Sequence, residues 1–149
     1  MIDVRRCPVI DIIENENLPV IQQEFSDEVA TYIKPASPEK LRGYIDMERA
    51  GVMQSIGAFC GEKLIGFVAV LAAKVPRCDA PMAVADGLYV ARAYRRTGAG
   101  VKLIREAEKY ARDIGSPCLA FGTPKDGPLA TILPRFGYDL TNIMFTKAV

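Results

Sequence analysis

The chain has 149 residues, of which 19 are Lys or Arg and 18 are Asp or Glu, so its formal net charge is +1. This near-neutral balance gives no general reason to expect a nucleic acid or an anionic membrane as partner. The chain has no histidine. A Ser-His-Asp triad, a Cys-His pair and a histidine-ligated metal are therefore excluded, and an enzyme built on this chain must move protons with carboxylates, Tyr, Cys, Lys or water.

Length and composition favour one globular domain spanning residues 1–149. The four cysteines share no CxxC spacing, which favours reduced thiols over a structural zinc site. The most apolar run, residues 64–73, has about half the length of a membrane-spanning helix. Acidic residues stand where a signal peptide has its apolar run. We therefore expect a cytoplasmic protein.

The first part of the chain predicts one strand and one interrupted helix. Residues 1–6 predict a strand that ends before Pro8. Residues 8–33 predict a helix with an interruption near Asn17. The second half of this helix carries an apolar face of residues three or four positions apart: Leu18, Ile21, Phe25, Val29 and Ile33.

The next segments predict a second helix and two strands. Ser37 is suited to be the N-cap of this helix, with Pro38 at its first position and Gly51 just past its end. Residues 52–60 and 63–73 then predict two strands joined by a tight turn. The second of these strands is apolar almost throughout, so we expect it to be central and covered on both faces.

The second half of the chain alternates strands and helices. Residues 82–91 predict a strand, 98–114 a helix, 117–123 a strand and 127–137 a short helix, while 138–149 predict a final strand or a tight pair of strands. The whole order is β-α-α-β-β-β-α-β-α-β. It predicts an α/β (α+β) fold with a mixed sheet and helices on both faces.

The segment RRTGAG, residues 95–100, lies between a predicted strand and a predicted helix. The first amides of a helix lack partners within the helix, so a glycine-rich turn at this point predicts an anion site. A Walker loop would need Lys and Ser or Thr directly after Gly100, and a dinucleotide fingerprint would need a glycine in place of Leu103. Both alternatives fail. The competing interpretation is a structural turn with solvated arginines.

The spacing that does fit is Arg-x-x-Gly-x-Gly, formed by Arg95, Gly98 and Gly100, with Val90 five residues before the arginine. The segment LYVARAYRRTGAGVKLI closely resembles the acetyl-CoA signature of the GNAT superfamily of N-acetyltransferases. The segments GEKLIGFVAV and PRFGY are similar to weaker parts of the family pattern, and the element order matches over essentially the whole chain. The ending GYDLTNIMFTKAV is similar to small acetyltransferases of phages and prophages.

The resemblance implies a largely antiparallel central sheet of about six to seven strands with about four helices on both faces. It implies acetyl-CoA as co-substrate and no metal. The pantetheine arm would be lined by Leu88, Tyr89 and Val90. The residues implied to wrap the pyrophosphate are Arg95, Arg96, Thr97, Gly98, Ala99, Gly100 and Val101.

The implied reaction moves the acetyl group to a primary amine of a small molecule or a protein, by direct attack through a tetrahedral intermediate. Asp86 is the first candidate base because it lies four residues before Val90, where many relatives carry Glu. Strand alternation places Asp86, Leu88 and Val90 on one face unless a bulge intervenes. The competing role for Asp86 is a loop cap or an ion pair. Tyr89 is the second candidate, with packing as its competing role.

Two positions depart from the family pattern. Leu133 stands where many members carry a Tyr as the general acid, and Asp126 stands where many carry Asn. Water, Tyr138 or Thr123 are the remaining candidates for the acid. The second hypothesis is therefore a catalytically inactive CoA-binding module, structural or regulatory. A third hypothesis is a nucleotide-phosphate binder that uses the same loop.

Specificity for the acceptor is expected from the first two helices and the last strands. The segment after Gly137 leaves little chain to cover a small substrate, which suits a protein amine or a second subunit that closes the site. A homodimer is therefore a further expectation. Glu48 is expected to be a solvated charge and Cys118 a buried apolar residue.

Overall fold

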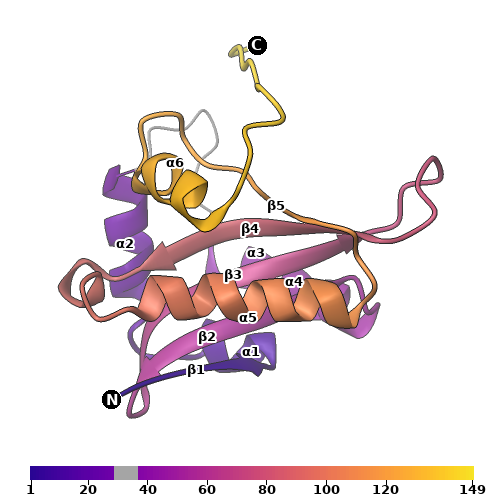
Figure 1. The fold of residues 1–149 in the computed structure, drawn as a ribbon. Helices are drawn as coiled ribbons and strands as arrows, with labels where there is room; N and C mark the ends of the chain where they lie inside the picture. Colours follow the sequence, from indigo (N-terminus) through magenta and orange to yellow (C-terminus); the bar gives the residue numbers. More distant parts are fainter. Residues whose placement is uncertain (29–36) are drawn as a thin grey trace.

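The computed structural model describes residues 1–28 and 37–149. A mixed sheet runs through the centre, and the order of its strands across the sheet equals their order in the chain (Figure 1). Neighbouring strands are antiparallel from β1 to β4, whereas β4 and β5 are parallel. The strands are β1 (Ile2–Cys7), β2 (Met53–Cys60), β3 (Lys63–Ala73), β4 (Met82–Val90) and β5 (Leu119–Phe121).

Helices cover both faces of the sheet. The long helix α5 lies across one face, and α1 to α4 lie behind the other (Figure 1). The α-helices are α1 (Val9–Ile13), α2 (Leu18–Glu28), α3 (Pro38–Leu41), α4 (Gly43–Arg49), α5 (Ala99–Asp113) and α6 (Pro128–Ile132). Two 3-10 helices, η1 (Arg92–Tyr94) and η2 (Leu133–Phe136), precede α5 and follow α6.

The core consists of two apolar layers, one on each face of the sheet. The layer under α5 contains Leu103, Ala107 and Ala111, which recur every four residues along the helix and therefore share one side of it. The opposite layer contains Ile12 of α1 and Ile21 of α2. β3 supplies residues to both layers, which confirms the prediction that the strand over residues 63–73 is central and covered on both sides.

A β-bulge interrupts β4 at Gly87 and Leu88. Tyr89 pairs with Phe67 of β3, whereas Asp86 pairs with Ala69, so two residues of β4 face one residue of β3. Gly87 has φ +67°, a conformation that glycine adopts without strain. The bulge therefore shifts the alternation of side chains along β4 by one residue.

The shift separates residues that alternation alone would place together. Before the bulge Ala85 packs in the layer under α5, and after it Leu88 and Val90 do so. Asp86, next to Ala85, therefore lies on the opposite face, which is also the face of Tyr89. We expected Asp86 to share a face with Leu88 and Val90 unless a bulge intervened. The bulge is present, so Asp86 lies on the other face.

The number of strands differs from the expectation. The described part of the chain has five strands, not six or seven, because residues 138–149 form no strand. They follow α6 and η2 and extend away from the sheet (yellow in Figure 1). The helices are also shorter and more numerous than the four expected, since a break at Arg42 divides the second predicted helix into α3 and α4.

The break between α1 and α2 confirms the predicted interruption near Asn17. The Asn15 side-chain oxygen accepts a hydrogen bond from the Asn17 amide at 3.1 Å, and the Asn17 side chain donates to the Leu64 carbonyl at 2.7 Å. These contacts compete with helical hydrogen bonds and tie the turn to β3. Val29 and Ile33, predicted to extend the apolar face of α2, lie outside the described residues. No helix in residues 1–28 and 37–149 is long and apolar enough to cross a membrane.

Candidate active site

The segment that joins β4 to α5 forms a glycine-containing turn that leaves several backbone amides unpaired in the described chain. Gly98 is the residue just before α5, and its carbonyl accepts the first helical hydrogen bond, from the Lys102 amide at 3.1 Å. Among the described residues, no backbone partner is present for the amides of Gly98, Gly100 and Val101. These unpaired amides and the dipole of a helix of 15 residues favour a negative group at this end of α5.

The two glycines keep this end of α5 open. A Cβ atom at Gly98 would meet no atom within 4 Å, but the φ of +84° is strained for a residue with a side chain. A Cβ atom at Gly100 would lie 3.7 Å from Cγ2 of Val90, an ordinary contact. Gly98 is therefore required by its backbone conformation, and both positions leave the amides accessible to a ligand.

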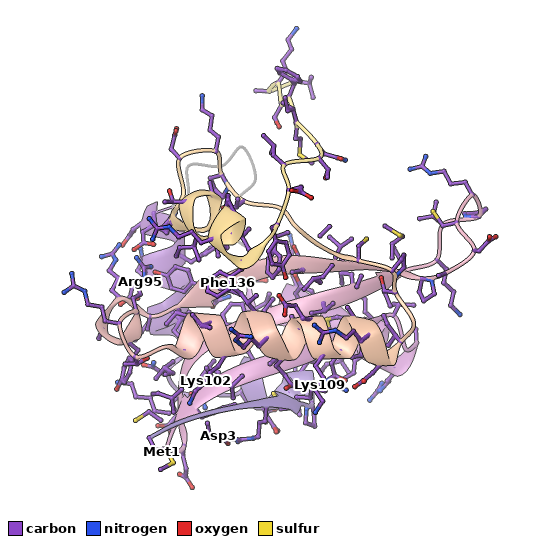
Figure 2. The ribbon with its side chains drawn as sticks, viewed as in Figure 1. Met1, Asp3, Arg95, Lys102, Lys109 and Phe136 are labelled. Carbon is purple, nitrogen blue, oxygen red and sulfur yellow. The ribbon has the colours of Figure 1, made fainter. Side chains whose placement is uncertain are left out.

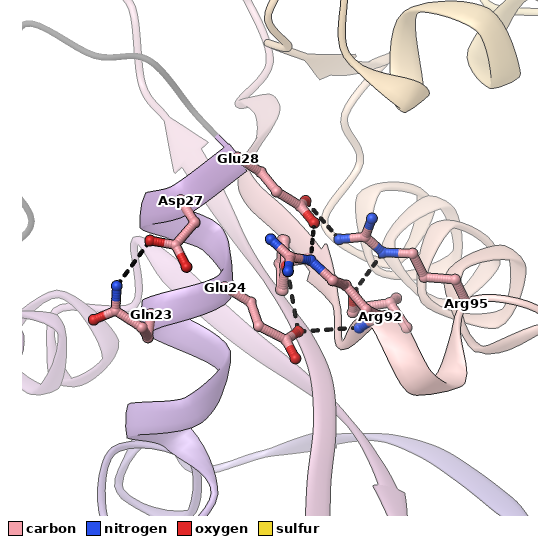
Figure 3. Close-up of polar contacts among 8 residues, drawn as sticks. Gln23, Glu24, Asp27, Glu28, Arg92 and Arg95 are labelled. Atoms are coloured by element: carbon pink, nitrogen blue, oxygen red, sulfur yellow. Dashed lines mark hydrogen bonds and ion pairs between the residues drawn. The ribbon is translucent and has the colours of Figure 1, made fainter.

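The Arg95 side chain does not extend toward these amides. Its Nε donates to the Val90 carbonyl at 3.1 Å, and its Nη2 donates to a Glu28 oxygen at 2.6 Å (Figure 3). Its guanidinium carbon also lies 5.1 Å from the centre of the Tyr89 ring. Arg95 therefore stabilises the turn through these contacts, and Arg96 is exposed beside it.

Helix α2 holds the same turn through two carboxylates. Glu28 accepts a second charged hydrogen bond from Arg92 Nε at 2.6 Å, and Glu24 accepts one from the Arg92 amide at 3.0 Å (Figure 3). Burial disfavours the Glu28 carboxylate, but its hydrogen bonds from Arg95 and Arg92 outweigh this effect and lower its pKa below the ordinary value. The network joins α2 to the turn before α5.

Beyond Ala85, one edge of β4 is open. β4 pairs with β5 only from Ala83 to Ala85, and β5 then leads away from β4 toward α6 (Figure 1). Between Asp86 and Val90 the described structure therefore pairs β4 only with β3. This opening lies directly before the turn into α5, so a long ligand could contact the open edge with one part and the unpaired amides with another.

Asp86 is exposed on β4 and accepts a hydrogen bond from the hydroxyl of Tyr44 on α4, at 3.0 Å. Burial of Tyr44 raises the pKa of its hydroxyl to about 12, and the charge and hydrogen bond of Asp86 contribute to the rise. Tyr44 therefore remains a neutral donor near neutral pH. The carboxylate of Asp86 is oriented by this bond while it stays accessible.

Tyr89, the second predicted candidate, lies in the packed layer opposite α5. The residue is 6% exposed, and its ring meets that of Phe25 edge-on with 5.4 Å between the ring centres. Its hydroxyl donates to Glu24 at 3.4 Å, and burial raises its pKa to about 12. These contacts favour the packing role for the Tyr89 side chain, and they leave its backbone as the part that borders the opening.

The helical segment after β5 carries the departures from the family pattern. Leu133 is buried and Asp126 is exposed. Tyr138 donates its hydroxyl to Glu108 of α5 at 2.8 Å, and burial together with this bond raises the pKa of Tyr138 above its ordinary value. Tyr138 and Thr123 are the two side chains considered as the general acid. The Tyr138 hydroxyl is already bonded to Glu108. The Thr123 hydroxyl donates to the Pro124 carbonyl at 3.4 Å.

A concave region lies away from this site. A groove of about 540 Å³ separates β1 from α5, with Asp3 on one side and Lys102 and Lys109 on the other (Figure 2). β1 and β5 form opposite edges of the sheet, so the far wall of this groove is remote from the open part of β4. We assign the candidate site to the opening beside β4 because the unpaired amides and Asp86 lie there.

Sequence reasoning missed Tyr44, Glu24 and Glu28. Their partners stand 42 to 68 residues away in the chain, so no local spacing indicates them. Glu48 is not a solvated charge, since it accepts a hydrogen bond from the Val9 amide at 2.7 Å and caps α1. Cys118 is exposed, and its predicted burial is wrong, because it precedes the short edge strand β5.

Comparison with known proteins agrees with this geometry. The model of the acetyltransferase (GNAT) family matches residues 18–138. No curated protein sequence matches significantly.

Solved structures share the fold at low sequence identity. An aminoglycoside acetyltransferase from an uncultured soil metagenomic sample is 15% identical with a TM-score of 0.78, over 99% of this chain and 96% of that one. Glucosamine-6-phosphate N-acetyltransferase from Arabidopsis thaliana is 12% identical with a TM-score of 0.78, over 99% and 98% of the two chains. Ribosomal-protein-alanine N-acetyltransferase from Brucella melitensis is 14% identical with a TM-score of 0.69, over 99% and 97%.

The match to the family model covers the whole candidate site, from α2 through the turn before α5 to Tyr138. It includes the Arg-x-x-Gly-x-Gly spacing and the open part of β4. On this evidence, the chain belongs to the acetyltransferase (GNAT) family.

Proposed function

We propose that this protein transfers the acetyl group of acetyl-CoA to a primary amine. The observation that supports this most directly is the continuity between the open edge of β4 and the unpaired amides of Gly98, Gly100 and Val101. CoA has a pyrophosphate and a long pantetheine arm. The first suits the end of α5, and the second suits an extended strand edge.

Different parts of the turn have different roles in this proposal. The amides of Gly98, Gly100 and Val101 bind the pyrophosphate oxygens, and the exposed Arg96 adds positive charge. Arg95 acts indirectly, because its bonds to Val90 and Glu28 hold the turn in shape. Thr97 and Ala99 belong to the same turn, where the Ala99 amide lies 3.4 Å from the Thr97 hydroxyl oxygen.

The chemistry takes place at the bulged part of β4. The amine nitrogen attacks the thioester carbon, and a backbone amide near Leu88 or Tyr89 stabilises the oxygen that becomes negative. The new C–N bond forms first and gives a tetrahedral intermediate, and the C–S bond breaks when this intermediate collapses and releases the CoA thiolate. Asp86 accepts the amine proton through a water, and Tyr44 orients its carboxylate.

The leaving thiolate needs no dedicated acid in this scheme. A thiol has a pKa of about 8.5, so the thiolate is an acceptable leaving group and can take a proton from water. Leu133 cannot donate a proton, and the Tyr138 hydroxyl is bonded to Glu108. The proposal therefore relies on positioning and on the base, which can supply a large part of the rate.

The second candidate function is a CoA-binding module that does not catalyse acetyl transfer. Leu133 is the observation in its favour, because it replaces the expected acid with a buried apolar side chain. Both candidates require CoA binding. They differ in whether acetyl-CoA is consumed when an amine is present.

The test combines calorimetry with turnover. We expect acetyl-CoA and CoA to bind and ATP not to bind, which separates the proposal from a nucleotide-phosphate binder. Thiol release is then followed with an amine panel chosen from the acceptors that the similar structures are named for: an aminoglycoside, glucosamine 6-phosphate and a peptide with an N-terminal alanine. CoA binding without thiol release on any amine would favour the module, and no CoA binding would contradict both candidates.

A further inference from the structure

The groove between β1 and α5 is lined by a row of basic side chains. They come from exposed positions of α5 that are three or four residues apart: Lys102, Arg105, Lys109 and Arg112. Residues with this spacing lie along one side of a helix, so the charges follow the length of the groove. Figure 2 shows Lys102 and Lys109 at separate points of α5, on the side toward β1. The α5 wall of the groove is therefore strongly positive.

The acidic side chains of the groove do not neutralise this row, because arginines of β1 already engage both of them. Asp3 is paired with Arg5. Glu106 accepts a hydrogen bond from Arg6 Nε at 2.9 Å. Within the part of the chain that the structure describes, the first three basic residues of the row form no ion pair. The groove thus retains uncompensated positive charge and favours an anionic partner.

The other wall of the groove is an edge strand. Among the described strands, β1 pairs only with β2. Ile2 and Val4 pack toward the layer under α5, whereas Asp3 alternates to the other face. All three residues line the groove, so the groove extends to the outer edge of β1. An unpaired strand edge presents N–H and C=O groups with which another extended chain can pair.

Polar contacts hold the two walls of the groove together. The Lys102 ammonium donates to the Ile2 carbonyl at 3.2 Å. Further along, the Arg6 guanidinium bonds to Glu106 and, at 2.6 Å, to Asp113. The groove has a volume of about 540 Å³, within the range of ordinary ligand sites. It is therefore formed before a ligand binds, which lowers the cost of binding.

We propose that the groove binds an extended acidic segment of a partner protein, which adds as a strand to the outer edge of β1 and directs carboxylates toward α5. Side chains on one face of a strand follow one another at about 6.6 Å. Lys102 and Arg112 are ten positions apart, or about 15 Å along α5. Acidic residues at three alternate positions of the partner strand therefore match the length of the basic row.

The strand edge favours a peptide over a nucleic acid as this partner. A nucleic acid also carries regular negative charge, but its backbone has no N–H and C=O groups to pair with a strand. The whole chain has a net charge of only +1, so the positive charge belongs to the groove and not to the surface in general. An acidic peptide uses both the charge and the edge, whereas a nucleic acid would use the charge alone.

The first experiment follows the fluorescence anisotropy of a labelled peptide of alternating Glu and Thr as the full chain is added. We expect saturable binding that weakens as the salt concentration rises. A protein with Lys102→Gln, Arg105→Gln and Lys109→Gln should bind about 5-fold to 100-fold more weakly, because three charged contacts are lost. Gln keeps the helix propensity of these exposed positions, so the circular dichroism spectrum should stay unchanged.

The matched control carries Lys40→Gln, Lys74→Gln and Arg77→Gln, which remove as many exposed basic side chains outside the groove. It should bind the peptide as the wild type does. An equal loss in this control, no binding of the peptide to the wild type, or equally tight binding of an oligothymidylate of the same charge would overturn the proposal. Acetyl-CoA is not used, so the result does not depend on the proposed function.

The second experiment tests the addition of a strand to β1. Hydrogen exchange of residues 2–7 should slow when the peptide binds, while residues 82–90 of β4 should not change. Two further peptides keep all carboxylates but are methylated at the backbone nitrogens of either Glu or Thr, so each lacks the N–H donors of one edge. At least one of them should bind more weakly. Unchanged exchange in β1, or equal affinity of all three peptides, would overturn the proposal.

Discussion

Arg95 and Glu28 form an ion pair at 2.6 Å although 67 positions separate them in the chain. Arg95 is the arginine of the Arg-x-x-Gly-x-Gly spacing, and sequence reasoning assigned it to the pyrophosphate. In the structure it bonds to α2 and to the Val90 carbonyl, and so connects the helix layer behind the sheet to the turn before α5. The backbone amides and Arg96 remain as the groups that we propose to bind the anion at this turn.

Replacement of Glu28 by Gln should destabilise the fold by about 1 kcal/mol near neutral pH, because two charged hydrogen bonds become neutral ones. The folded-state pKa of Glu28 is lowered, so its contribution is present above its ordinary pKa of 4.5 and disappears as the pH falls through the folded-state value. Urea unfolding at about pH 7 and about pH 3 should therefore show a smaller difference from wild type at the lower pH. Asp27→Asn on the exposed side of α2 is the control, and an equal loss at both pH values would contradict the role of the charge.

Replacement of Gly98 by Val should weaken acetyl-CoA binding by about 100-fold or more, since a β-branched residue at φ +84° must change the turn and displace the amides. Isothermal titration measures this loss. Gly61→Val is the matched control, because Gly61 has φ +62° in the β2–β3 turn, also with no atom near its Cβ position. Both variants carry similar strain, so an equal effect on binding would show that the loss reflects stability and not the site.

Asp86→Asn should lower kcat by about 100-fold to 10,000-fold while acetyl-CoA affinity stays unchanged, because the amide cannot accept the amine proton. Steady-state kinetics with the best amine of the panel and calorimetry give the two values. Asp46→Asn on α4 controls for the removal of an exposed carboxylate nearby. If kcat is retained in Asp86→Asn, the assigned base is wrong.

Tyr44→Phe should reduce kcat/KM by about 3-fold to 10-fold, the value of one ordinary hydrogen bond. Tyr44 acts through Asp86, so the same substitution should have almost no effect when Asp86→Asn is already present. The pKa of Tyr44, about 12, means that its hydroxyl stays a neutral donor near neutral pH. Additive losses in the double variant would show that the Tyr44 hydroxyl acts independently.

Leu103→Ala should destabilise the protein by about 2 to 5 kcal/mol, because Leu103 is fully buried between α5 and the sheet. Thermal and urea unfolding report the loss. Val20→Ala, at a position that is 53% exposed, should change stability by less than about 0.5 kcal/mol. Similar losses at the two positions would contradict the assignment of the α5 layer as the core.

Periodicity predicted the elements that build the sheet and its main helix. The apolar run over residues 63–73 and the helical pattern over residues 98–114 depend only on local sequence, and both predicted elements are confirmed. The glycine-rich turn could also be predicted from local sequence. Gly98 adopts the positive φ that its position before the helix requires. These features could be predicted because each is encoded within a few consecutive residues.

The orientation of Asp86 and the partners of Arg95 depend on distant parts of the chain. The bulge at Gly87 changes the face of every residue on one side of it, and a glycine inside a strand pattern was the available signal. Glu28 and Tyr44 had no comparable signal, because the packing of α2 and α4 against the sheet brings them to the site. The final segment was predicted as a strand from its composition, but a strand also requires a partner, which this chain does not provide in the described structure.

The strands lie across the sheet in the same order as they follow in the chain, and this order affects how the chain folds. β2, β3 and β4 follow one another directly, so each can pair with the strand that precedes it after closing only a short loop. β5 is different, because its parallel pairing with β4 must wait until α5 has crossed the sheet. β2, β3 and β4 can therefore assemble early, while the opening between β4 and β5, where the candidate site lies, is completed late.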